Sequence, residues 1–454
     1  MSFSKKAQAG QYSASERREE SSYRAKGYCE PVEPEEHAIT LNTTESQEIS
    51  LSTAQRNTKS SIGRRAVAYP AAFFSIVGIQ TLLLGMNFYL QDVYGATGGQ
   101  IGSFYAARSL LYIVGCFVAR PLTTAIRPQY LLIASPVSTG VLCLAITCSD
   151  SLVPAFVLFF LTGISNSLFW PTLVAWLSSN LEGGQLSKTM NEFNASWTVG
   201  AIVSPFLASQ LSEAGTALPI HAASAMMLFT AVFVLVGTVA LPKICDGRHV
   251  ATAEPKTKVE TDESTVLRYA GWIGVFSAFL AFGVLANIFP KFARTDLHMS
   301  KSTIGVVFSL RSLSTALAFL ALGRTVFWHH RGSQMLVGQF CIIAVLLAMV
   351  YARGVVTIGV ILAVAGATIA LSYSNGLFHG LAGSRSRAAR IAVHEAFLQV
   401  GSVGGSFFGG LIYQYYSIVA SYLCCAAVAF VGLIAQGAIT IWARRTTPGA
   451  GLTT

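Results

Sequence analysis

Charged residues are scarce in this 454-residue sequence, where only 11% of positions are Asp, Glu, Lys or Arg. Ordinary soluble proteins carry roughly 25% of these residues. Hydrophobic residues make up 53% of the chain, and the mean hydropathy is +0.55. This balance excludes an ordinary soluble globular protein and indicates a chain that crosses a membrane several times.

Sequence patterns for metal, nucleotide and nucleophile chemistry are also missing. The eight cysteines are scattered, and none forms a CxxC pair or a Cys/His cluster that would predict a zinc site or a disulfide framework. The sequence has no phosphate-binding GxxxxGK[ST] loop and no GxSxG nucleophile elbow. We therefore expect no enzyme, no catalytic residues, no metal site and no cofactor. Any transport would be driven by an ion gradient or by the gradient of the solute itself.

Long apolar runs are abundant instead. A helix needs about 20 apolar residues to cross the hydrocarbon layer of a bilayer. The sequence predicts twelve such spans, at 67–90, 99–119, 129–148, 152–178, 187–211, 220–241, 267–290, 302–323, 333–352, 355–381, 388–413 and 416–442.

Basic residues are distributed unevenly between the loops on the two sides of these spans. The loops on the side of the N-terminal tail hold eighteen Lys and Arg, whereas the other side holds Lys291, Arg294, Lys301 and Arg353. Basic loops mark the cytoplasmic side of a membrane. We therefore predict a multi-pass protein of the plasma (inner) membrane with both termini in the cytoplasm. The net charge of +10 then reflects topology and predicts no binding of nucleic acid.

Two polar stretches divide the chain. Residues 1–63 lack an apolar block and predict a disordered cytoplasmic tail. Residues 242–266 are polar and charged, and they predict a cytoplasmic linker between a six-helix bundle at 64–241 and a second one at 267–445. A short C-terminal tail at 446–454 follows. We expect a monomer in a lipid bilayer.

The two halves carry a repeated sequence. IGSFYAARSL at 101–110 is echoed by IGVVFSLRSL at 304–313, an offset of 203 residues. Further matches occur at offsets of 201 to 204: Gly163 with Gly366, Leu168 with Leu371, Trp170 with Tyr373, Gly200 with Gly401, and Phe206 with Phe407. This run of matches indicates that a six-span unit was duplicated.

Two parallel six-span halves joined by a long loop resemble the major facilitator superfamily of secondary transporters, over residues 64–445. That superfamily usually has G-x-x-x-D-R-x-G-R-R between spans 2 and 3. Here the segment reads GCFVARPLTTAIR, where Gly115 and Arg120 match but Ala119 and Leu122 replace the Asp and the second Gly. The resemblance implies an all-α membrane protein with two pseudo-symmetric six-helix bundles, a substrate site between them near the midplane, and alternating access.

Two arginines lie in the middle of apolar spans. Arg108 and Arg311 occupy equivalent places in spans 2 and 8, where an arginine costs at least about 2.5–3.5 kcal/mol on insertion scales. We predict that both contact the substrate. Across a shared cavity they would repel each other unless an anion such as a carboxylate or phosphate lay between them. The alternative is that each guanidinium donates hydrogen bonds to a neighbouring helix.

Glu192 and Glu395 are the acidic residues that fall inside predicted spans. In the superfamily span 5 packs against span 8 and span 11 against span 2. This packing would bring Glu192 to Arg324 or Arg331, and Glu395 to Arg120 or Arg127. The alternative is a permanent contact at the helix ends. The predicted cytoplasmic gate comprises Arg120, Arg127, Glu192, Arg324, Arg331 and Glu395.

Further polar and aromatic residues fall in spans 1, 4, 7 and 10, which line the cavity in this superfamily. The predicted substrate contacts there are Asn87, Asn287, Trp170, Tyr373 and Asn375. The alternative is that the amides join helices by hydrogen bonds and that the rings fill the bundle.

Together these features predict a secondary active or facilitative transporter of a small solute, with a co-transported proton or ion as an open question. A small organic anion is one candidate solute, and a sugar or an exported drug is another. A function of a different class is a membrane sensor that transports nothing and signals through the N-terminal tail.

Overall fold

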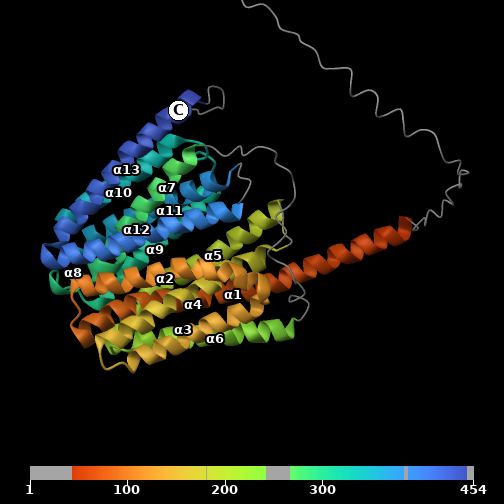
Figure 1. Ribbon diagram of the computed structural model, residues 1–454, viewed down its shortest axis with the longest axis horizontal. Coiled ribbons are helices and arrows are strands. Elements are labelled where there is room, and N and C mark those ends of the chain that lie inside the picture. The colour runs from red at the N-terminus through yellow and green to blue at the C-terminus, as the bar shows by residue number, and fades with distance from the viewer. Residues whose placement is uncertain (1–42, 180, 182, 242–265, 383–386, 447–454) are drawn as a thin grey trace, which may run out of the picture. The chain divides into compact units, whose positions relative to one another are not determined.

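The computed structural model describes residues 43–179, 181, 183–241, 266–382 and 387–446. All regular secondary structure in these ranges is helical (Figure 1). The N-terminal half comprises α1 (Thr43–Tyr94), α2 (Gly98–Ala125), α3 (Pro128–Thr147), α4 (Leu152–Ser178), α5 (Gly183–Ala214) and α6 (Leu218–Ala240). The C-terminal half comprises α7 (Leu267–Phe282), the π-helix η2 (Gly283–Ile288), α8 (Phe289–Thr295), α9 (Lys301–Gly323), α10 (Gly332–Tyr351), α11 (Val355–Leu381), α12 (Arg387–Tyr415) and α13 (Ile418–Thr446).

The predicted spans correspond closely to these helices, with α7, η2 and α8 following one another as a single span, Leu267–Thr295. Within the described residues eleven helical stretches are long and apolar enough to cross a membrane. The remaining predicted span, 187–211, lies in α5, which is 32 residues long but begins with the polar sequence GGQLSKTMNEFN. The architecture is therefore the all-α membrane bundle that the sequence predicts.

Helix α1 begins at Thr43, within the stretch 1–63 that is predicted to be a tail. Once a helix exists, each added residue gains a backbone hydrogen bond without the cost of nucleation, so the apolar part of α1 extends into a polar sequence. Residues 1–42 of the predicted tail, residues 242–265 of the predicted linker at 242–266, and residues 447–454 of the predicted tail at 446–454 lie outside the described residues. The chain from Arg56 onward forms one compact unit.

The sequence repeat is visible as a repeated helix contact. Helix α2 packs on α4, and α9 packs on α11. A Cβ atom on Gly163 of α4 would collide with the carbonyl oxygen of Arg108, and one on Gly366 of α11 would collide with the carbonyl oxygen of Arg311. Both contacts need glycine, because the backbones approach too closely for a side chain. The same contact, displaced by 203 residues, supports duplication of the unit.

The bundle has two ends that differ in their connections. We call the end with the connections at 95–97, 148–151, 215–217, 296–300, 352–354 and 416–417 the short-turn end. The opposite end, where the chain leaves α6 and enters α7, is the linker end.

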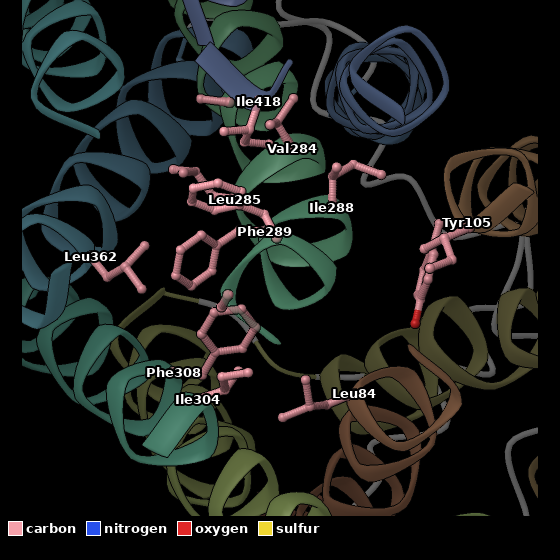
Figure 2. Close-up of a cluster of buried hydrophobic side chains, with 14 of the residues drawn as sticks. Leu84, Tyr105, Val284, Leu285, Ile288, Phe289, Ile304, Phe308, Leu362 and Ile418 are labelled. Carbon is pink, nitrogen blue, oxygen red and sulfur yellow. The ribbon is translucent and has the colours of Figure 1, made fainter. Parts of the chain in front are cut away.

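Among the described residues, the buried apolar cluster that includes both halves lies toward the short-turn end. One large cluster of buried side chains there includes Leu84 of α1 and Tyr105 of α2 together with Ile288, Phe289 and Ile304 of the C-terminal half (Figure 2). At the linker end the core is divided into separate clusters. One comes only from α1, α3, α4, α5 and α6, and the other only from α7, α10 and α13. The halves are therefore packed together at one end and have separate cores at the other.

Candidate functional site

A three-residue ion pair joins the halves at the short-turn end. Asp92, near the end of α1, lies 2.6 Å through Oδ1 from Nη1 of Arg294 and 2.7 Å through Oδ2 from Nζ of Lys301. The three side chains are between 11% and 27% exposed, so water screens them only in part. We call Asp92, Arg294 and Lys301 the Asp92 latch, because one carboxylate of the N-terminal half holds two bases of the other.

Helix α9 is also tied to α5 at this end. The ammonium of Lys301 donates a hydrogen bond to the carbonyl oxygen of Ser212 at 2.8 Å, and the backbone N–H of Ser302 donates to Oε1 of Glu213 at 3.2 Å. The first turn of α9 therefore holds both α1 and α5, and a movement of α9 at this end would have to break both connections.

Helices α2 and α12 form a second seam between the halves. The backbone N–H of Gly99 donates to Oε1 of Gln414 at 3.0 Å. A Cβ atom on Gly102 would collide with the carbonyl oxygen of Ser406. Small residues that let two helix backbones approach this closely are a common basis of helix association in membranes.

Asn87 and Asn287, both predicted to contact substrate, meet each other across this interface. Nδ2 of Asn87 donates to the backbone oxygen of Asn287 at 2.6 Å, and Nδ2 of Asn287 donates to Oγ of Ser406 at 2.8 Å. Both side chains are buried. Asn287 lies in η2, and wide π-turns inside α-helices often occur at functional sites. In this structure the two amides join helices by hydrogen bonds, which is the alternative to substrate contact.

Arg108 is enclosed by its own half. Its Nε donates to Oγ1 of Thr162 in α4 at 3.2 Å, and its Cζ lies 5.9 Å from the ring centroid of Phe159. Nη2 is buried and has no hydrogen-bond partner. The Thr162 bond is the neighbouring-helix contact given above as the alternative to substrate binding.

Arg311 lies among aromatic rings of its own, C-terminal half. Its Cζ is 4.9 Å from the ring centroid of Phe282 in α7 and 5.4 Å from that of Phe308 in α9. Its Nε is buried without a hydrogen-bond partner. The recorded contacts of Arg108 and Arg311 therefore come from separate halves.

The predicted aromatic contacts lie farther toward the linker end. Trp170 of α4 meets Phe193 of α5 edge-on, with ring centroids 6.2 Å apart. Tyr373 of α11 lies between Phe319 and His394, at centroid distances of 5.8 and 4.8 Å. Asn375 of α11 is buried; its Nδ2 donates to a carbonyl oxygen of its own helix, and its Oδ1 has no partner.

Glu192 has partners inside the N-terminal half. Its Oε2 accepts a hydrogen bond from the hydroxyl of Tyr69 at 2.8 Å and lies 3.7 Å from Nη1 of Arg65, both in α1. The predicted pairing with Arg324 or Arg331 is not formed in this structure, where Arg324 is exposed.

Glu395 is partly buried in α12, and among the described residues no ion pair joins it to Arg127, which is exposed. The side chain of Arg120 lies outside the described residues. The predicted gate would close at the linker end, where the two halves have separate cores. The gate therefore stays a prediction for a second conformation.

The Asp92 latch was not predicted from the sequence, where Arg294 and Lys301 indicated only the topology. A signal was present nonetheless. The predicted outer loops hold four bases, two of which are the latch bases, and Asp92 stands at the end of the first span on the same side. Opposite charges that are rare on one face of a membrane protein are candidates for mutual pairing.

Comparison with known proteins agrees with this architecture. The family model of the Major Facilitator Superfamily matches residues 68–378 and 271–453. The solved structure of the nucleoside transporter NupG is similar at a TM-score of 0.65 and 12% identity, covering 83% of this chain and 98% of that chain. The human organic anion transporter MFSD10 (TETRAN) is similar at a TM-score of 0.57 and 14% identity, covering 83% of this chain and 99% of that one.

The sequence matches no curated protein. At 12% and 14% identity the two solved structures establish a shared fold and leave the solute open. The family match extends over both halves and over more than half of the chain. The protein therefore belongs to the Major Facilitator Superfamily, and it is an integral membrane protein and a membrane transporter.

Proposed function

We propose that the protein moves a small solute by alternating access, with the two halves rocking about a central path. The observation that carries the proposal is the difference between the ends. A shared apolar core and the Asp92 latch join the halves at the short-turn end, whereas the halves have separate cores at the linker end. Halves that are joined at one end and have separate cores at the other are expected in one of the two states that such a transporter alternates between.

The second state would require the linker end to close. Arg127 and Arg324 of the predicted gate are exposed in this structure, so their side chains are available for that purpose. If both termini lie in the cytoplasm of a plasma-membrane protein, as the basic loops predict, the linker end faces the cytoplasm, and we infer that this is the end that closes in the second state.

The solute class is a separate question. The prediction of a small organic anion rests on Arg108 and Arg311, and it stays a prediction. The Thr162 and Phe159 contacts of Arg108 and the ring contacts of Arg311 favour a role within each half. The buried, unpaired Nη2 of Arg108 leaves one donor that an anion could use.

Alternating access can be tested without knowing the solute. Spin labels on Val153→Cys and Tyr416→Cys report the distance between the halves at the short-turn end, and labels on Tyr130→Cys and Val326→Cys report it at the linker end. All four positions are exposed. The exposed native cysteines Cys148 and Cys424 would be replaced by serine. We expect pulsed electron–electron double resonance to show two distances for each pair. Molecules with the short distance at one end should have the long distance at the other.

The Asp92→Asn variant supplies the perturbation. In this variant the fraction of molecules with the long distance at the short-turn end should increase. The fraction with the short distance at the linker end should increase with it. A single fixed distance at both ends, in the wild type and in the variant, would contradict alternating access.

Deletion of residues 1–60 separates transport from signalling, because only a sensor needs the tail for its output.

A further inference from the structure

Glu395 is a carboxylate without a cation at the junction of the two halves. It lies in α12, which packs on α2 of the other half. The carboxylate is close enough to the hydroxyls of Tyr112 in α2 and Tyr373 in α11 to interact with both electrostatically. No hydrogen bond or ion pair joins it to any of the described residues, although the side chain is partly buried.

The equivalent region of the N-terminal half shows what a structural glutamate looks like in this fold. Glu192 of α5 is held by the Tyr69 hydroxyl and by Arg65. A carboxylate that is withdrawn from water without such partners is unfavourable, and ionisable residues inside membrane spans usually serve a function. No described residue supplies such a partner to Glu395 in this conformation, so we infer that the carboxylate is available to a bound cation.

A row of aromatic rings runs beside Glu395 and crosses between the halves. Trp197 of α5 and Phe319 of α9 have centroids 6.2 Å apart, Phe319 and Tyr373 are 5.8 Å apart, and Tyr373 and His394 are 4.8 Å apart. We call these four residues the aromatic row. Its first member belongs to the N-terminal half and the other three to the C-terminal half, so the row crosses the contact between α5 and α9.

The members of this group lie at one depth. At 1.5 Å per residue they are about 25–32 Å along their helices from the short-turn end. Trp197, Phe319 and Tyr373 are partly exposed, so their rings are not sealed inside a packed core. His394 is buried, and neither of its ring nitrogens has a hydrogen-bond partner.

We propose that Glu395 and the aromatic row form the binding subsite for a flat, positively charged solute. The proposal rests on the transport function proposed above and adds a solute class to it. Aromatic faces attract cations and stack on planar rings, and a carboxylate in a poorly solvated site attracts the same charge strongly. The free ring nitrogens of His394 add hydrogen-bonding capacity on the same helix.

A proton is the other cation that Glu395 could bind. The aromatic row favours an organic solute, because a proton has no need of four rings spread across both halves. The two occupants make different predictions for a neutralised glutamate. Loss of a solute site weakens binding of an organic cation, whereas loss of a proton site alters only the response to pH.

The test is a binding assay on the purified full chain with three probes of similar shape. They are the cation 1-methyl-4-phenylpyridinium, the neutral 4-phenylpyridine at pH 8, and the anion 4-phenylbenzoate. We expect the cation to bind the wild type at least about tenfold more tightly than the other two, from the combined charge and ring contacts. Glu395→Gln should weaken cation binding by about tenfold, and Tyr373→Leu should weaken it severalfold.

Glu192→Gln is the matched control, since it neutralises the glutamate that has partners of its own. It should change cation affinity by less than about twofold. The inference is overturned if the wild type prefers the anion, if it binds no cation, or if Glu395→Gln leaves cation affinity unchanged and removes only a pH response. The spin-label distances distinguish the failure of the two proposals. If the distances alternate but no cation binds, only the subsite is contradicted. If the distances are fixed, alternating access is contradicted.

Discussion

The two halves carry similar residues in unlike surroundings. Glu192 in α5 is fixed by Tyr69 and Arg65, whereas Glu395 in α12 has no cation among the described residues and lies beside aromatic rings. The duplicated unit determines where each glutamate stands along its helix. The neighbours that changed after duplication determine whether the glutamate holds the bundle together or is left available for a partner.

Charge distinguishes the halves at the short-turn end as well. Displaced by the repeat offset of 203, Asp92 corresponds to Thr295, Arg294 to Gln91 and Lys301 to Gly98. Neither half could form the latch with a copy of itself. The connection between the halves therefore depends on how the two copies diverged, and substitutions can test each difference.

The largest effect is expected from Asp92→Asn, which removes the charge that pairs with Arg294 and Lys301. Loss of one partner costs about 2–5 kcal/mol when a hydrogen-bonded ion pair is buried and about 0–1 kcal/mol when it is exposed. The side chains of the Asp92 latch are between 11% and 27% exposed, so we expect a cost between these limits. We expect the short-turn end to open in most molecules, as measured by the spin-label distance between positions 153 and 416.

Asp296→Asn is the control for the latch. Asp296 lies at the same end, but it accepts hydrogen bonds from Thr295 and Tyr413, both in the C-terminal half. This variant should leave the distance between the halves unchanged. An equal shift in both variants would mean that the latch contributes nothing specific.

Gly163→Ala and Gly366→Ala test whether the two copies are packed alike. Each added methyl group meets a backbone carbonyl oxygen, of Arg108 in one half and of Arg311 in the other. Overpacking of this kind typically costs about 1–3 kcal/mol. We expect both variants to lower the melting temperature in detergent by similar amounts. A large effect in one half alone would break the structural equivalence.

Glu395→Gln should raise the melting temperature of the protein without ligand. A polar group that is fully buried without a partner costs about 1–3 kcal/mol, and we expect part of that cost for the partly buried carboxylate of Glu395. A neutral amide is less costly to keep in that place. A variant that melts at a lower temperature would show that Glu395 has a stabilising partner in the membrane bundle. Differential scanning fluorimetry measures this shift.

The smallest effect is expected from Glu192→Gln. The pair with Arg65 is 3.7 Å long, and its carboxylate side chain is 39% exposed, so solvent screens it. Such exposed pairs contribute about 0–1 kcal/mol. A small decrease in melting temperature, opposite in sign to that of Glu395→Gln, would sharpen the contrast between the halves.

The sequence predicts the fold well because the fold depends on patterns that are visible along the chain without knowledge of the contacts between helices. Apolar runs of sufficient length indicate helices, and an offset of 203 residues indicates two copies. The glycines that matched in the sequence, Gly163 and Gly366, make matching contacts. The start of α1 at Thr43 could not be read from apolar runs, because a polar sequence there continues an existing helix.

The site was less predictable because its contacts depend on how the halves meet. Spacing placed Asn87 and Asn287 at similar depths, but it could not show that they bond to each other. Burial of an arginine in a span indicates that it needs a neighbour, and Thr162 could not be chosen from the sequence alone. Likewise, the pairing of Asp92 with bases about 200 residues away is a property of the assembled bundle.

The wide turn η2 offers a way to release the latch by twisting a single helix. It separates α7 from α8, and α8 carries Arg294. Each residue of an α-helix adds about 100° of rotation, so converting η2 to regular α-helix would rotate α8 by about that angle relative to α7. Such a ratchet would turn Arg294 away from Asp92 while most of the bundle stays still.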